Sequence, residues 1–229
     1  MHRFRSKVSY AEVVSFDIFD TLVGRLCMLP TDVFFRAALA HGVGRRKALR
    51  FRTDRIEAER RARSASAMGE VTLTDIYSSM PQYGQAERNA LMEAEIAAER
   101  ALCRPVGRGV RMFSMAKEMG KTVVLTTDMY LPRGVIEELL ARCGVSGYDE
   151  LFLSCERGVG KRSGDLFRLA ARQMGVVASS IVHVGDSPGA DVRGALRAGV
   201  RPIFVPRRNM VGRTLVSLLP DRLAAALRL

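Results

Sequence analysis

The pattern that most constrains the fold is an alternation of short apolar segments with single helical segments in the second half of the chain. The apolar segments, which we expect to be strands, are residues 122–126, 151–153, 181–184 and 202–205. The helical segments beside them are residues 106–118, 132–143, 164–174 and 188–198. Strands separated by single helices form a parallel sheet that helices cover on both faces. A fifth apolar segment, residues 13–16, is typical of a buried strand in such a sheet. The pattern predicts an α/β fold with a Rossmann-like, doubly wound parallel sheet.

A long helical stretch interrupts this alternation after the first strand. We expect helices at residues 31–39, 48–67, 71–77 and 86–103. The sequence thus predicts a core domain made of residues 1–24 and 104–210, with a helical insert at residues 25–103. Leucines recur at helical spacing near the C-terminus, which predicts a C-terminal helix over residues 211–229. That helix could pack on the sheet, pair with a second copy in a homodimer, or touch a membrane surface.

Charge and composition restrict the partners. The formal net charge of +12 favours anionic partners. The chain has no tryptophan and few other aromatic residues to stack on bases, so we do not expect nucleic acid as the main partner. No apolar run is long enough to span a bilayer, and no secretion signal follows the basic N-terminus. The cysteines are scattered without the pairing of a metal site, so we expect a cytoplasmic protein with free thiols.

Polar residues follow the predicted strands at the points where the strands end. Asp17 comes directly after the first strand, and Thr127 follows the second. Lys161 lies in the loop after the third strand, and Asp186 and Asp191 lie in the loop after the fourth. The carboxyl ends of parallel strands share one edge of the sheet, where ligands of such folds bind. We therefore expect these side chains to meet in one site.

In this order and on these elements, the residues resemble the haloacid dehalogenase superfamily. The motifs that carry the resemblance are Asp17 with Thr21 and Leu22, then Thr127, then Lys161, and finally Asp186 with Asp191. The resemblance covers roughly residues 11–206 and implies that the insert is a helical cap domain. The phrase Phe-Asp-Ile-Phe-Asp-Thr-Leu at residues 16–22 also resembles a subgroup of bacterial hydrolases.

The resemblance implies a nucleophilic mechanism. Asp17 would attack the substrate and form an aspartyl intermediate, which water then hydrolyses. Thr127 and the Lys161 ammonium would hold the oxygens of a transferring phosphoryl group, and Lys161 would also keep Asp17 ionised.

The resemblance also implies a Mg²⁺ site and a substrate site. Asp17 and Asp186, with the backbone carbonyl of Phe19, would hold the ion. Asp191 would be a further ligand through water, or the partner that positions Lys161. The substrate-binding residues implied are Thr21, Arg25 and Asp128. His183, inside a predicted strand, is interpreted as a core histidine with its hydrogen bonds satisfied.

One position departs from the phosphatases of the superfamily. Most of them carry a second Asp two residues after the nucleophile, which protonates the leaving group. This chain has Phe19 there and Asp20 one residue later, where the resemblance implies glycine. We expect a Mg²⁺-dependent phosphatase that acts on a small phosphorylated metabolite through an aspartyl-phosphate intermediate. A metal-independent 2-haloacid dehalogenase-type hydrolase and a catalytically silent module that binds a phosphorylated ligand are the alternatives.

Overall fold

The computed structural model describes residues 1–207, and these form two compact units. One unit consists of residues 1–24 and 104–207, and the other of residues 25–103. We refer to them as the core unit and the helical unit. The helix predicted at residues 211–229 lies outside the described residues.

A five-stranded parallel sheet forms the centre of the core unit, with the strand order β5-β4-β1-β6-β7. Its strands are β1 (Val13–Phe16), β4 (Thr122–Thr127), β5 (Glu150–Leu153), β6 (Ile181–Gly185) and β7 (Arg201–Phe204). In the register of the sheet, Phe16 at the end of β1 lies level with Leu125 of β4 and Val184 of β6. The carboxyl ends of these three strands therefore reach the same edge. The predicted doubly wound α/β fold is confirmed.

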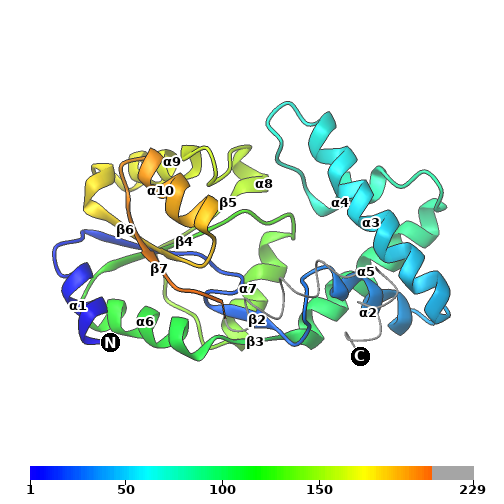
Figure 1. Ribbon diagram of the computed structural model, residues 1–229, viewed down its shortest axis with the longest axis horizontal. Coiled ribbons are helices and arrows are strands. Elements are labelled where there is room, and N and C mark those ends of the chain that lie inside the picture. Colours follow the sequence, from blue (N-terminus) through cyan, green and yellow to red (C-terminus); the bar gives the residue numbers. More distant parts are fainter. Residues whose placement is uncertain (208–229) are drawn as a thin grey trace. The chain divides into compact units, whose positions relative to one another are not determined.

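Helices pack on both faces of this sheet. They are α1 (His2–Val8), α6 (Gly107–Glu118), α7 (Arg133–Arg142), α8 (Ser154–Arg157), α9 (Asp165–Met174) and α10 (Ala195–Arg197). In Figure 1, α1 and α6 lie on one face of the sheet, and α9 and α10 on the other. Phe16 packs against Phe4 of α1 and Phe113 of α6, with ring centroids 6.4 and 5.8 Å away. On the opposite face, Leu166 and Phe167 of α9 join the apolar core.

Some elements of the core unit differ from the sequence expectation. Helix α1 was not expected, because only Phe4 and Val8 of its residues are buried and the apolar period is weak. The short helix α8 lies in a segment where no helix was predicted. The single helix expected at residues 188–198 begins instead as a wide π-helical turn, η2 (Pro188–Gly194), before α10. Such turns are common where a helix carries a functional side chain.

The helical unit contains α2 (Asp32–Ala40), α3 (Arg45–Ala65), α4 (Leu73–Ser78) and α5 (Gln85–Leu102). A fully buried ion pair lies at its centre: Arg55 of α3 donates two hydrogen bonds of 2.8 and 2.9 Å to Glu95 of α5. Tyr77 of α4 also donates to Glu95, at 2.9 Å, and the Arg55 guanidinium stacks over the ring of Phe34. These contacts satisfy the buried charges, which would otherwise be costly to desolvate.

The chain segments at the sequence boundaries of the two units form a separate two-stranded sheet. Its strands are β2 (Val23–Arg25) and β3 (Cys103–Pro105). Within residues 1–207, no helix is long and apolar enough to cross a membrane.

Candidate active site

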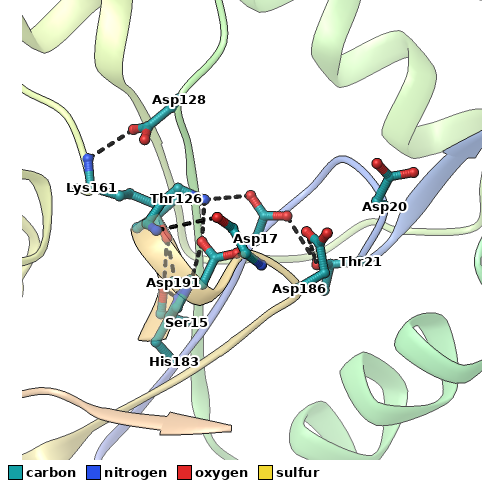
Figure 2. A network of polar contacts seen from close by, with 12 residues as sticks. Ser15, Asp17, Asp20, Thr21, Thr126, Asp128, Lys161, His183, Asp186 and Asp191 are labelled. Carbon is teal, nitrogen blue, oxygen red and sulfur yellow. Dashed lines mark hydrogen bonds and ion pairs between the residues drawn. The ribbon is translucent and has the colours of Figure 1, made fainter. Parts of the chain in front are cut away.

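The polar residues predicted at the strand ends come together at the carboxyl edge of the core sheet (Figure 2). Asp17 follows β1 directly, and its backbone N–H donates to the Val184 carbonyl of β6 at 2.8 Å. Thr127 ends β4 and is buried. Asp186 follows β6, and Asp191 projects from the η2 turn. The parallel sheet thus brings together residues that lie up to 174 positions apart in the chain.

The Lys161 ammonium connects two carboxylates. Its Nζ donates to Asp17 Oδ1 at 2.5 Å and to Asp191 Oδ1 at 2.6 Å, and all three side chains are buried. Burial raises the pKa of Asp17, and the nearby ammonium opposes that rise. Burial alone would lower the pKa of Lys161, but the two carboxylates outweigh it and raise that pKa. Burial would raise the pKa of Asp191, but Lys161 holds it well below its usual range.

The hydroxyl of Thr21 and the guanidinium of Arg207 complete the other side of the cluster. Thr21 Oγ1 donates to Asp17 Oδ2 at 2.9 Å and lies 3.5 Å from Asp186 Oδ1. Arg207 donates from Nε to Asp186 Oδ2 and lies 3.7 Å from the Asp20 carboxylate. Burial raises the pKa of Asp186, while Arg207 counteracts this rise.

Three carboxylates of this cluster could hold a metal ion. Asp17, Asp186 and Asp191 each offer an oxygen, and these oxygens all lie within 4.8 Å of one another. The donors are hard oxygens, which suit Mg²⁺. Among the described side chains that contact these carboxylates, Lys161 and Arg207 carry the compensating positive charge, one unit less than three ionised carboxylates require. The donor set and the charge balance both fit a bound cation.

Two glycines make the geometry of the site sterically feasible. A Cβ on Gly185 would lie 2.4 Å from the Asp191 side chain, and a Cβ on Gly194 would lie 2.0 Å from the carbonyl oxygen of Lys161. Contacts this short do not occur between real atoms of these types. Glycine at position 185 therefore leaves room for the Asp191 side chain against β6, and glycine at position 194 allows the η2 turn to approach the loop that carries Lys161.

The loop after Asp17 holds the residues that depart from the expected motif. The side chain of Phe19 has no group that can exchange a proton and no atom that can bind a metal ion. Only its backbone carbonyl could be a metal ligand. Asp20 has a φ of 64°, and it is the one residue other than glycine with a positive φ among residues 1–207. Glycine adopts this left-handed backbone most readily, which gives a physical reason for the glycine that the resemblance implies there. The Asp20 carboxylate lies apart from Asp17 and Lys161 in Figure 2.

Two residues predicted to bind substrate make protein contacts. Asp128 Oδ1 accepts a hydrogen bond of 2.9 Å from the backbone N–H of Lys161, so it orders the lysine loop. Arg25, in the helical unit, donates from Nε and Nη2 to Glu99, both at 2.8 Å. Roles in substrate binding for Arg25, Asp128 and Thr21 stay predictions.

The sequence interpretation missed several residues that contact the cluster. His183 is a buried core histidine, as expected, but its Nε2 also lies 3.2 Å from Asp191 Oδ1. Its Nδ1 lies 2.9 Å from Ser15 Oγ, which in turn lies 3.0 Å from Thr126 Oγ1. The signal available in the sequence was one buried polar residue in each of three predicted strands, namely Ser15, Thr126 and His183. Arg207 carried no such signal, since it follows the last predicted strand in an arginine-rich segment.

The helix-covered parallel sheet and the carboxylate cluster at its carboxyl edge define an α/β protein with a candidate active site, and comparison with known proteins assigns the family. Residues 11–199 match the haloacid dehalogenase-like hydrolases. The chain therefore belongs to this family of hydrolases.

Curated relatives with similar sequences are phosphatases. Over 132 residues the chain is 34% identical to a phosphoserine phosphatase of Thermus thermophilus, covering 52% of this chain and 53% of the relative. Over 71 residues it is 39% identical to a glyceraldehyde 3-phosphate phosphatase of Methanopyrus kandleri, covering 31% of this chain and 30% of the relative. The matched segments thus span about half or less of these relatives.

Similar solved structures include dehalogenases. A 2-haloacid dehalogenase from Pseudomonas syringae has a TM-score of 0.62 at 20% identity, with 85% of this chain and 86% of that chain covered. A magnesium-bound HAD-family hydrolase from Bacillus subtilis has a TM-score of 0.59 at 16% identity, with 85% and 88% covered. At these identities the likeness shows the fold alone.

Proposed function

We propose that this hydrolase is a Mg²⁺-dependent phosphatase, which acts on a small phosphorylated metabolite through an aspartyl-phosphate intermediate. The observation that carries the proposal is the presence of Asp186 and Asp191 beside Asp17, with oxygens of all three within 4.8 Å of one another. Buried carboxylates so close together repel one another, and a divalent cation would relieve that repulsion. The phosphatase relatives support the same type of reaction.

In this reaction Asp17 is the nucleophile. One of its carboxylate oxygens forms a bond to phosphorus while the bond from phosphorus to the leaving oxygen breaks, and the leaving group takes that electron pair. Water then attacks the aspartyl phosphate, which restores the Asp17 carboxylate and releases inorganic phosphate. Thr21 fixes one oxygen of Asp17 and Lys161 fixes the other, so the nucleophile is already oriented before substrate binds.

Positive charge near the phosphoryl group comes from two sources. The Lys161 ammonium lies against Asp17, where it can stabilise the negative charge of the transferring group together with the hydroxyl of Thr127. Asp17, Asp186 and the Phe19 carbonyl would hold Mg²⁺, which supplies further compensation of that charge. We assign Asp191 to the positioning of Lys161, because Lys161 and the backbone N–H of Ser187 occupy one oxygen each.

Phe19 restricts the substrate rather than abolishing the reaction. With no acid at this position, an alkoxide leaving group would depart without a proton from the expected residue. We propose that the preferred substrates are those whose leaving group is stable as an anion or is protonated by the substrate itself. The helical unit is proposed to act as the cap that selects among them.

The test is phosphate release from p-nitrophenyl phosphate, whose leaving group needs little protonation. The wild-type protein should release phosphate with Mg²⁺ and stop when a chelator is added, and Asp17→Asn should be inactive while remaining folded by circular dichroism. Absence of release from the folded wild-type protein in Mg²⁺ would contradict the proposal. Binding of inorganic phosphate without turnover would then support a silent ligand-binding module.

Phe19 also favours a second candidate, a carbon–halogen hydrolase. A departing halide needs no proton, so the missing acid is no handicap for that chemistry. Such an enzyme would release halide from a 2-haloacid at the same rate with and without chelator. The proximity of Asp186 to Asp17 argues for the phosphatase, because in a metal-free site this second carboxylate would repel the nucleophile.

A further inference from the structure

We propose that His183 is a positioning residue for this reaction. Its Nε2–H holds the Asp191 carboxylate in place, and Asp191 in turn holds the Lys161 ammonium against Asp17. The inference rests on the proposed function only for its effect on turnover, since the hydrogen-bond direction can be measured independently.

The Asp191 carboxylate is held from three directions. Oδ1 accepts from Lys161 Nζ at 2.6 Å and lies 3.2 Å from His183 Nε2, and Oδ2 accepts from the backbone N–H of Ser187 at 2.7 Å. The lysine is flexible, whereas the imidazole and the backbone are rigid. Removing the imidazole would leave the carboxylate free to rotate about the Ser187 contact, and the ammonium would follow it.

The chemistry of the neighbouring groups defines one tautomer of the ring. An ionised carboxylate can only accept hydrogen bonds, so the proton must be on Nε2. Nδ1 of the neutral ring is then an acceptor, and the hydroxyl of Ser15, 2.9 Å away, donates to it. Ser15 Oγ can accept in turn from the hydroxyl of Thr126, 3.0 Å away. Figure 2 shows Ser15 and His183 next to Asp191.

A role in packing alone does not account for this arrangement. The ring of His183 packs edge-on against Phe167, with centroids 4.6 Å apart, and an apolar side chain could make that contact. Ser15, Thr126 and His183 instead bring polar groups from three adjacent strands into the sheet interior, where each is nearly fully buried. Such groups are costly unless every one is paired. The hydrogen bonds of these three groups run in series from Thr126 to His183 and end at the Asp191 carboxylate, which orients Lys161.

Two amide variants separate the two nitrogens of the ring. In His183→Gln the amide nitrogen can take the place of Nε2 and donate to Asp191, whereas in His183→Asn it lies near the place of Nδ1 and cannot reach Asp191. We expect His183→Gln to keep most of the wild-type kcat on p-nitrophenyl phosphate. His183→Asn should lower kcat by about 10- to 100-fold, with a much smaller change in KM, as is usual when a partner of an active-site group is removed.

Phe167→Leu is the control for packing. It loosens the contact with the imidazole and should lower the thermal midpoint, but it leaves every hydrogen bond of His183 in place and should retain kcat. Equal kcat values for His183→Asn and His183→Gln, or an equal loss of kcat in Phe167→Leu, would overturn the positioning role.

Nitrogen-15 NMR of the imidazoles tests the hydrogen-bond direction without any turnover. The chain has three histidines, so the ring signals of His183 can be assigned by their loss in His183→Gln. We expect the Nε2–H tautomer in the wild-type protein and the Nδ1–H tautomer in Asp191→Asn, whose amide can donate to Nε2. An Nδ1–H tautomer in the wild-type protein would refute the inference even if the phosphatase activity is found. An inactive wild-type protein with the Nε2–H tautomer would contradict the proposed function alone.

Discussion

Lys161 shows how a single side chain serves both the chemistry and the stability of the site. It is buried between Asp17 and Asp191, so its ammonium compensates two carboxylates that water cannot solvate. A lysine in a loop gives little sign of a functional role in the sequence. Only its position after the end of a predicted strand indicated that Lys161 belongs to the site. The structure gives it contacts that a solvent-exposed lysine would not have.

Lys161→Met should therefore lose both turnover and stability. The variant leaves two buried carboxylates without their partner, and breaking a buried ion pair costs about 3–5 kcal/mol. Urea unfolding of the metal-free protein and phosphate release with Mg²⁺ would measure the two effects. Lys117→Met is the matched control, because Lys117 pairs with Asp149 at the surface and such pairs contribute at most about 1 kcal/mol. If Lys161→Met turned over at the wild-type rate, the role assigned to the ammonium would be wrong.

The η2 turn is the element that brings Asp191 to Lys161. A regular helix was expected at residues 188–198, since the sequence shows proline at its start and glycine after its end. The wider turn depends on a close approach of two backbone segments, at Gly194 and Lys161, and such a contact leaves no periodic signal. Strands and helices that follow apolar periodicity could be predicted, whereas this local widening could not.

Gly194→Ala should disrupt this approach. Its Cβ would meet the Lys161 carbonyl oxygen at 2.0 Å, so the turn must shift away from the lysine loop. We expect lower stability and a loss of phosphate release, measured by thermal unfolding and by activity on p-nitrophenyl phosphate. Gly134→Ala in α7 is the control. No atom outside the neighbouring residues of its own helix lies within 4 Å of its added Cβ, and Gly134 is the second residue of α7, so alanine there should lower neither stability nor activity. Wild-type activity and stability in Gly194→Ala would contradict the argument.

At the scale of the whole molecule, the sheet fold can be predicted from the sequence, whereas the buried contacts between charged residues cannot. The order of strands and helices, and the meeting of Asp17, Lys161, Asp186 and Asp191, follow from apolar periodicity and from the shared edge of parallel strands. The buried pair of Arg55 and Glu95 and the contact of Arg207 with Asp186 depend on distances between segments remote in sequence. Apolar periodicity assigns charged residues to the solvent-exposed surface, so it does not predict buried charged pairs such as these.

Binding of Mg²⁺ at the carboxylate cluster should stabilise the folded chain as a whole. A ligand present at about 100 times its dissociation constant adds about 2.7 kcal/mol to the free energy of unfolding when it binds only the folded state. We therefore expect a Mg²⁺-dependent rise of the thermal midpoint, followed by calorimetry without substrate.

Asp186→Asn should lose most of this rise, because it removes a charged ligand. Asp165→Asn, at a half-buried residue that pairs with Arg168 away from the carboxylate cluster, should keep the rise in full. The comparison is made within each variant, with and without Mg²⁺, so that changes in baseline stability cancel. An equal rise in Asp186→Asn and the wild type would place the ion elsewhere, and no rise in the wild type would favour chemistry without a metal. Because this measurement needs no turnover, it separates the metal site from the identity of the substrate.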